Sequence, residues 1–132
     1  MITFKVQTKQ RCEFVDITLE INHALQESGV TDGIVMVYCP HTTAGITINE
    51  NADPAVSRDI LMKTSKIFDH LDRDYRHGEG NSDSHIKSSF FGASEMVIIE
   101  KGKLVLGTWQ AIYFAEFDGP RIRKVFLKII SR

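Results

Sequence analysis

The chain has 132 residues, of which 42% are hydrophobic and 25% are charged, and its formal net charge is -1. This length and apolar content predict a single domain, residues 1–132, with one packed core that needs no disulfides. The near-neutral charge excludes a broad basic field for nucleic acid or anionic lipid, and every apolar run is far shorter than the ~20 residues of a membrane helix. Because the first residues also lack the pattern of a secretory signal, we expect a cytoplasmic protein with no nucleic-acid or membrane partner.

The first part of the chain predicts strands around one helix. Alternating polar and apolar residues indicate an opening pair of strands over Thr3–Thr8 and Glu13–Ile17. Apolar residues then recur at helical spacing as far as Gly29, a residue type suited to ending a helix. The apolar run Gly33–Cys39 is typical of a buried strand, and Ile46–Ile48 predicts a partner strand.

Two further helices and a long loop are expected in the middle of the chain. Asp53 and Pro54 favour a helix start, since aspartate accepts bonds at the N-cap and proline suits the first helical position. This helix should reach about Phe68, after which Asp69–Ser84 loses the apolar pattern and predicts a long loop. A short helix follows as far as Phe91.

The start and end of that short helix also have sequence signals. Ser82 or Asp83 can cap its beginning, and Gly92 can end it in a left-handed conformation. The rest of the chain is predicted to form strands with turns at Lys101–Gly102 and Gly119–Pro120. The expected strands are Met96–Glu100, Leu104–Leu106, Thr108–Phe117 and Arg123–Ile130.

The first of three segments with candidate chemistry surrounds His41. An imidazole and hydroxyl groups are followed by Asn49, Glu50 and Asp53 at the ends of consecutive elements. Such a group of side chains can bind a metal or transfer a proton. The alternative is that His41 satisfies backbone groups in a turn and that Asp53 only caps a helix.

The second segment contains two histidines that flank a glycine-rich turn. His77 and His85 are eight residues apart, so the loop must fold back if both are to meet one ion. The turn and the helix start near Ser82 also offer backbone N–H groups to an anion. Lys87 can reach a bound phosphate or lie on a solvated helix face. Phosphate and metal are competing explanations for this segment, and His23 and His70 are left out of the site.

The third segment places polar groups on an otherwise apolar strand. Gln110 and Glu116 share one side of a regular strand, Trp109 faces the other side, and Arg121 follows near a turn. The alternative is a core tryptophan and a surface pair of Glu116 with Arg121.

Three segments, Cys39–Val56, His77–Ser94 and Gly102–Arg121, together resemble the YjbQ family, also called the secondary thiamine-phosphate synthase family. The likeness keeps the order and similar spacing of the motifs and extends over nearly the whole chain. It implies an α+β domain that has an antiparallel β-sandwich-like core with a few helices and that assembles as a homotrimer.

The resemblance also implies a polar site. Three histidines would converge on a divalent ion, zinc-like or magnesium or manganese with a phosphate substrate, and the partner would be a small phosphorylated metabolite. The implied metal ligands are His41, His77 and His85; the implied catalytic residues are Glu50, Asp53 and Glu116; the implied substrate- or phosphate-binding residues are Asn49, Asn81, Ser82, Lys87, Gln110 and Arg121.

The activity implied by the family name is a transfer reaction. A hydroxymethylpyrimidine diphosphate would be joined to a thiazole phosphate at the three-histidine site, with release of pyrophosphate. One alternative is a metal-dependent hydrolase of a phosphorylated or ester metabolite, with Glu50 or Glu116 as general base. Another is a noncatalytic trimer that binds a metabolite or a metal. Whether subunits share the site stays open.

Overall fold

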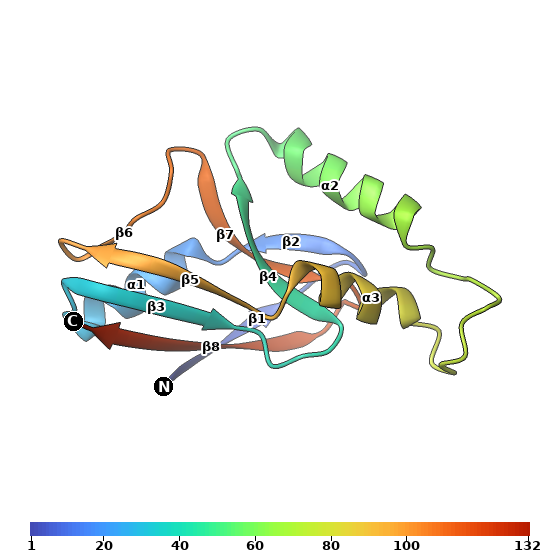
Figure 1. Cartoon of the computed structure of the whole chain (residues 1–132), viewed down its shortest axis with the longest axis horizontal. Coiled ribbons are helices and arrows are strands. Elements are labelled where there is room, and N and C mark those ends of the chain that lie inside the picture. The colour runs from blue at the N-terminus through green and yellow to red at the C-terminus, as the bar shows by residue number, and fades with distance from the viewer.

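The computed structural model describes residues 1–132 and has two antiparallel sheets and three helices (Figure 1). The five-stranded sheet has the order β1-β8-β3-β5-β6, and the three-stranded sheet has the order β2-β7-β4. The strands are β1 (Ile2–Gln7), β2 (Glu13–Asp16), β3 (Asp32–Tyr38), β4 (Ala44–Glu50), β5 (Ser94–Glu100), β6 (Lys103–Leu104), β7 (Gln110–Glu116) and β8 (Ile122–Ser131). The helices are α1 (Thr18–Ser28), α2 (Pro54–Ile67) and α3 (Ser82–Phe91). The predicted α+β fold with an antiparallel sandwich-like core is confirmed.

The hydrophobic core joins both sheets and α1. Val35 on β3, Phe114 on β7 and Ile21 on α1 are fully buried members of this one cluster. Along β3 the side chains alternate, so that Val35 and Val37 enter the core while Met36 and Tyr38 are exposed on the outer face. Burying each such aliphatic side chain contributes about 1.5–3 kcal/mol, and the alternation therefore fixes which face of the sheet points inward.

The predicted end of α1 and the predicted start of α2 are both confirmed. α1 is followed by Gly29 in the left-handed conformation, with φ 69°. The carboxylate of Asp53 accepts a 2.9 Å bond from the N–H of Ala55, and Pro54 occupies the first turn of α2. None of the helices has the length and apolar character needed to cross a membrane.

The short helix ends at Phe91 as predicted, but the predicted caps of α3 are wrong. Its N-cap is Asn81, whose side chain makes no capping bond, while the Asp83 carboxylate turns inward to Arg11 and Lys87. Gly92 has φ 93° and ψ 158°, which is not a left-handed helical conformation. Tertiary partners of α3 have replaced the local signals at both of its ends.

The predicted partnership of the strand at Ile46–Ile48 is also wrong. β4 pairs with β7 in the three-stranded sheet, while β3 pairs with β5 and β8 in the other. The connection 39–43 therefore passes from one sheet to the other and carries His41 with it.

A close backbone approach fixes α3 on β4. The N–H of Ile46 donates to the carbonyl of Gly92 at 3.1 Å, and the Ser88 hydroxyl donates to the carbonyl of Ala44 at 2.7 Å. A Cβ atom at Gly45 would lie 2.5 Å from the same Gly92 oxygen, so only glycine fits without movement of the backbone. These contacts set the position of α3 and of the histidine it carries.

Candidate functional site

The loop between α2 and α3 brings His77 next to His85. The two ring centroids are 5.3 Å apart, with the ring planes at 88°. The loop is held by its own contacts, in which the Tyr75 hydroxyl donates to the carbonyl of Asp69 at 2.7 Å and a ring nitrogen of His70 lies 3.0 Å from the carbonyl oxygen of Gly80. The fold-back that a shared ligand would require is therefore present in the chain.

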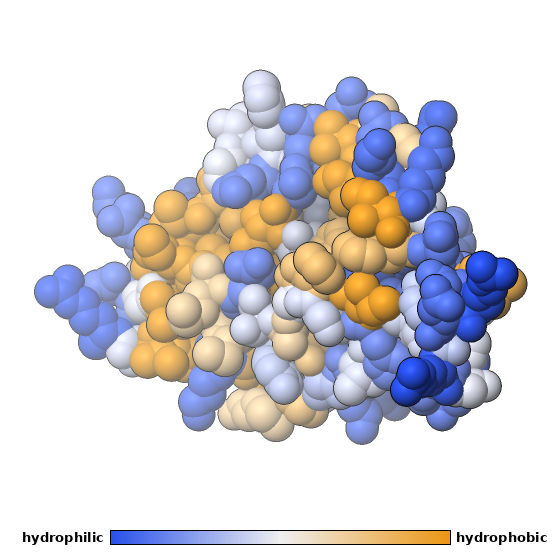
Figure 2. Space-filling model, turned by 45° about the vertical axis from the view of Figure 1, so that its right-hand side comes forward, coloured by the Kyte–Doolittle hydropathy of each residue, from blue (hydrophilic) through white to orange (hydrophobic).

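A surface hollow of about 480 Å³ surrounds this pair, and we call it the histidine hollow. An adjoining hollow of about 450 Å³ shares His77 with it, and another of about 570 Å³ shares His85. Figure 2 brings this end of the molecule forward and shows that its surface is mainly hydrophilic. The histidine hollow is lined by Asp74, Tyr75, Arg76, His77, Ser82, His85 and Ile86.

The five histidines differ in whether their ring nitrogens are already engaged. His41 accepts a 2.9 Å bond from the backbone N–H of Lys124, and His70 bonds with the carbonyl of Gly80. His85 makes no side-chain hydrogen bond within the chain, and His77 has only the exposed Glu79 carboxylate at 3.8 Å. The paired imidazoles of the hollow are therefore free to bind a ligand.

His41 does not join the other two predicted ligands. It lies between β3 and β4 with its ring at 81° to that of Phe114, and burial, with Arg123 nearby, lowers its pKa. No group of three or more His, Cys, Asp or Glu side chains in the chain is arranged to hold a metal ion. The predicted centre of His41, His77 and His85 is therefore wrong for one chain, because the His41 nitrogen is engaged by β8 and only the other two meet.

A buried ion-pair cluster lies under the first turn of α3. Both carboxylate oxygens of Asp83 accept bonds, at 2.9 and 3.1 Å from Arg11 and at 2.8 Å from Lys87. Burial opposes the ionised form of Asp83, but the bonds from Arg11 and Lys87 outweigh it and lower the pKa of this carboxyl. Lys87, predicted to reach phosphate, has a side chain only 3% exposed and is directed at Asp83.

Glu116 belongs to a second buried cluster. Its carboxylate accepts bonds from the Thr8 hydroxyl, the Arg123 guanidinium and the backbone N–H groups that follow β7. These contacts connect β7 and β8 with the end of β1 and leave Glu116 no exposed surface. Arg121 pairs instead with Asp118 at 3.2 Å, so a surface pair of Glu116 and Arg121 does not form.

Four further predicted site residues lie at or next to the other end of the three-stranded sheet: Asn49, Glu50, Asp53 and Gln110. Glu50 lies opposite Gln110 in the register, whereas Ala44 lies opposite Glu116. Six steps of about 3.4 Å separate Ala44 from Glu50, a span of about 20 Å. Asn49 and Gln110 bond to nearby backbone N–H groups, and Asp53 caps α2.

Asn81 is buried although its side chain is polar, and Trp109 is exposed although its side chain is aromatic. The Asn81 amide donates to Asp118 at 2.8 Å, while its own buried oxygen has no partner. Trp109 is 63% exposed in the turn before β7, so the alternative of a core tryptophan is wrong. Of the predicted binding residues, Ser82 is the one that lines the histidine hollow beside the two imidazoles.

Two residues that line the histidine hollow, Tyr75 and Arg76, were not predicted from the sequence. Tyr75 and Arg76 lie in the loop that was predicted from its lost apolar pattern, and their position next to His77 was the available signal. The Asp83–Lys87 pair also had a signal, since residues four apart share a helix face. No local signal connects Arg11 with Asp83, because 72 residues separate them.

Similar proteins span nearly the whole chain. It is 52% identical over 129 residues to the UPF0047 protein YugU of Bacillus subtilis, with 98% of each chain covered. A crystal structure from Clostridium acetobutylicum is 59% identical, with 98% and 100% of the two chains covered and a TM-score of 0.96. A structure from Sulfolobus solfataricus is 33% identical, with 99% and 96% covered and a TM-score of 0.93.

These relatives correct the predicted activity. The Clostridium protein is described as uncharacterized and the Sulfolobus protein as one of unknown function, and neither description mentions thiamine-phosphate synthesis. The chain also lacks the three-histidine centre on which the transfer and the alternative metal-dependent hydrolysis were based. The prediction of a thiamine-phosphate synthase is therefore wrong.

The family itself was predicted correctly. The model of the family described as "UPF0047 protein YjbQ-like" matches residues 2–132. A relative from Methanocaldococcus jannaschii, the UPF0047 protein MJ1081, is 54% identical and covers 99% of this chain and 94% of its own. On this evidence the chain belongs to the YjbQ-like UPF0047 family.

Proposed function

We propose that the protein binds a small phosphorylated metabolite in the histidine hollow. The observation that carries the proposal is the pair of facing imidazoles, His77 and His85, which are 5.3 Å apart and have no strong partner within the chain. Uncommitted imidazoles can donate hydrogen bonds to an anion, and two from different segments can contact one phosphoryl group.

The surroundings of the pair support an anionic ligand. The Arg76 guanidinium and the Ser82 hydroxyl line the same hollow, and both are donors. The first turn of α3 begins at Ser82 and presents backbone N–H groups without a side-chain cap. The one acidic residue of that turn, Asp83, is directed away from the hollow and is paired with two cations.

The hollow also limits the kind of ligand. Asp74 lines it, and the Glu79 carboxylate lies 3.8 Å from His77. A large polyanion would meet these carboxylates, whereas a single phosphoryl group can be placed between the imidazoles and Ser82. Binding of a divalent ion stays a prediction. One chain supplies only two imidazoles to such an ion, so a ligand oxygen or another subunit would have to complete its coordination.

Histidine NMR tests the proposal with inorganic phosphate as the probe. The ring-proton signals of His77 and His85 should shift and saturate as phosphate is added, while that of His23, on the exposed side of α1, should stay unchanged. His77→Ala and His85→Ala should each weaken binding about tenfold in calorimetry, since each removes a charge-assisted bond. His23→Ala is the matched control. Equal shifts of all five rings would contradict a specific site.

We also propose that the chain assembles as a homotrimer through the outer face of the five-stranded sheet. This face carries large apolar side chains that no element of the chain covers, among them Met96, Ile98 and Ile130, which are 63%, 60% and 47% exposed. Figure 2 shows apolar side chains gathered over the part of the molecule formed by this sheet. Patches of this kind on a small domain are typical of protein interfaces.

Sedimentation measures the assembly directly. The wild-type chain should sediment at three times the mass of one chain, and Ile98→Glu should dissociate it, because a charge would be buried in the contact. Ile67→Glu is the matched control, since Ile67 is equally exposed, at 61%, but lies on α2. A wild-type monomer would refute the trimer.

The cytoplasmic location also belongs to the proposal. Both cysteines, Cys12 and Cys39, are free, and burial raises the pKa of Cys39 to about 11. A buried free thiol such as that of Cys39 suits a reducing compartment.

A further inference from the structure

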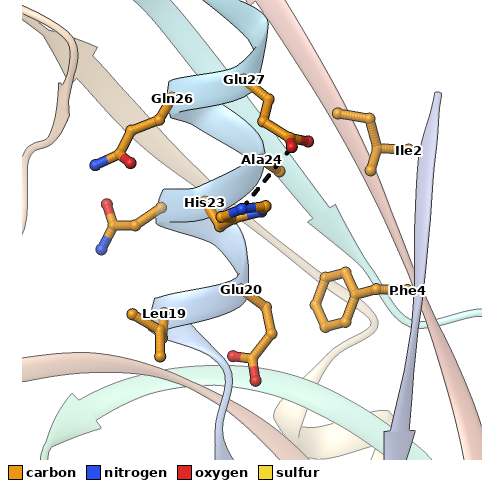
Figure 3. A pocket seen from close by; sticks show the side chains of 9 residues that line it. Ile2, Phe4, Leu19, Glu20, His23, Ala24, Gln26 and Glu27 are labelled. Carbon is orange, nitrogen blue, oxygen red and sulfur yellow. Dashed lines mark ion pairs between the residues drawn. The ribbon is translucent and has the colours of Figure 1, made fainter.

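A groove of about 520 Å³ runs between α1 and β1 and shares no residue with the histidine hollow. Figure 3 shows the helix and the strand side by side, with Ile2 and Phe4 of β1 pointing toward the helix. Leu19 and Ala24 contribute apolar surface from α1. Leu19 is 78% exposed although it belongs to an ordered helix that packs on the core. The groove therefore presents apolar surface that nothing in the chain covers, chiefly that of Leu19 and Ile2.

One wall of the groove is an open strand edge. β1 is the outermost strand of its sheet and pairs only with β8. The N–H of Thr8 donates to the carbonyl of Arg121 at 3.0 Å, so the even-numbered residues before it face β8 in the alternating antiparallel pattern. The N–H and C=O groups of Thr3, Lys5 and Gln7 consequently point to the open edge. These groups can pair with an added strand.

The other wall is acidic. In Figure 3 the carboxylates of Glu20 and Glu27 extend from α1 on the side that faces β1. The only basic group lining the groove is the imidazole of His23, which lies 3.8 Å from Glu27. No lysine or arginine lines the groove to balance the two carboxylates. The charge of this wall therefore favours a basic occupant.

We propose that the groove binds an extended, basic segment of a partner protein, which adds to β1 as a further strand. Its backbone pairs with Thr3, Lys5 and Gln7. On the one face of the added strand that is directed at α1, its apolar side chains contact Phe4 and Leu19, and its lysines or arginines approach the two carboxylates. Pairing supplies affinity that is independent of sequence, and the alternating side chains supply specificity.

A second copy of the chain fits this groove less well. Pairing of two β1 edges would place the acidic wall of each α1 beside that of the other, and like charges in contact oppose association. A small apolar ligand would cover Phe4 and Leu19 but would leave the strand edge and the carboxylates unpaired. A basic strand satisfies all three features of the groove.

Fluorescence anisotropy tests the proposal with a labelled peptide in which valine and lysine take turns along one face of the strand and threonine fills the other face, as in Val-Thr-Lys-Thr-Val-Thr-Lys. The peptide should bind saturably, and a peptide with glutamate in place of lysine should bind about tenfold more weakly or less. The double variant Glu20→Lys, Glu27→Lys should lose about tenfold in affinity for the lysine peptide. Asp59→Lys on the exposed side of α2 is the matched control and should bind like the wild-type chain.

The strand edge has its own test. Lys5→Pro removes one N–H that points to solvent, which edge strands tolerate, and it should weaken binding about tenfold. In the wild-type chain, the amides of Thr3, Lys5 and Gln7 should gain hydrogen-exchange protection when the peptide is added, whether or not the proline variant folds. The proposal would be overturned by equal affinity for both peptides or by protection elsewhere than β1. It would also be overturned if two copies paired through β1, which would appear as a larger mass of the assembly.

Discussion

Removal of the Asp83 carboxylate is expected to destabilise the fold far more than removal of the Lys87 charge. Asp83→Ala leaves the Lys87 ammonium, 3% exposed, without its only carboxylate partner. Leaving such a charge buried and unpaired costs about 3–5 kcal/mol. Arg11 is 31% exposed and can turn toward solvent, so it adds little to the cost.

The matched variant is Lys87→Met, which keeps most of the side-chain volume. Asp83 then retains both bonds from Arg11, and we expect a cost of about 1–2 kcal/mol. Urea unfolding followed by circular dichroism measures the difference. With a slope of about 1.5–2 kcal/mol per molar urea, Asp83→Ala should lower the midpoint by roughly 1.5–3 M and Lys87→Met by roughly 0.5–1.3 M. Equal losses in the two variants would refute the argument that the unpaired ammonium dominates.

The same carboxylate makes stability depend on pH. The pKa of Asp83 is lowered in the folded chain from its ordinary value of 3.8, so as the pH falls the unfolded chain binds the proton first. The stabilisation is complete above that ordinary value and is lost as the pH falls through the lower, folded pKa. Acid unfolding curves of wild type and Asp83→Asn should therefore converge toward low pH. Curves that stay parallel would show that this carboxyl does not contribute.

Two further substitutions test positions described above. Gly45→Ala should cost about 1–3 kcal/mol in thermal unfolding, because its Cβ would lie 2.5 Å from a backbone oxygen. Gly78→Ala, which has open space around the added Cβ, should be nearly neutral. Equal costs of the two substitutions would contradict this reasoning. His41→Ala should lose about 1 kcal/mol by leaving a backbone N–H of β8 unpaired, yet calorimetry should find phosphate binding unchanged. Loss of phosphate binding in that variant would return His41 to the site.

Elements with strong local signals were predicted closely. Asp53 and Pro54 fixed the start of α2, and Gly29 fixed the end of α1. The alternation over Arg123–Ile130 located β8, which extends one residue further at each end. These features depend on neighbours in the sequence, so the sequence alone contains the information.

Features that depend on distant contacts could not be predicted in the same way. β4 was assigned a partner from its neighbour in the chain, but its register is with β7, whose paired residues lie 60 to 72 positions later. The nitrogen of His41 is engaged by Lys124, 83 residues later, and no spacing rule anticipates that bond. The meeting of His77 with His85 was within reach of prediction, because both flank one short glycine-containing loop.

The exposure of Trp109 determines what its fluorescence can report. It is the single tryptophan of the chain and lies in the turn before β7 instead of in the core. Its indole is already largely in water in the folded state, so emission should change little when the core melts. The same indole is well placed as an optical reporter for whatever comes to cover that turn, since contact with another molecule would move it from water into an apolar environment.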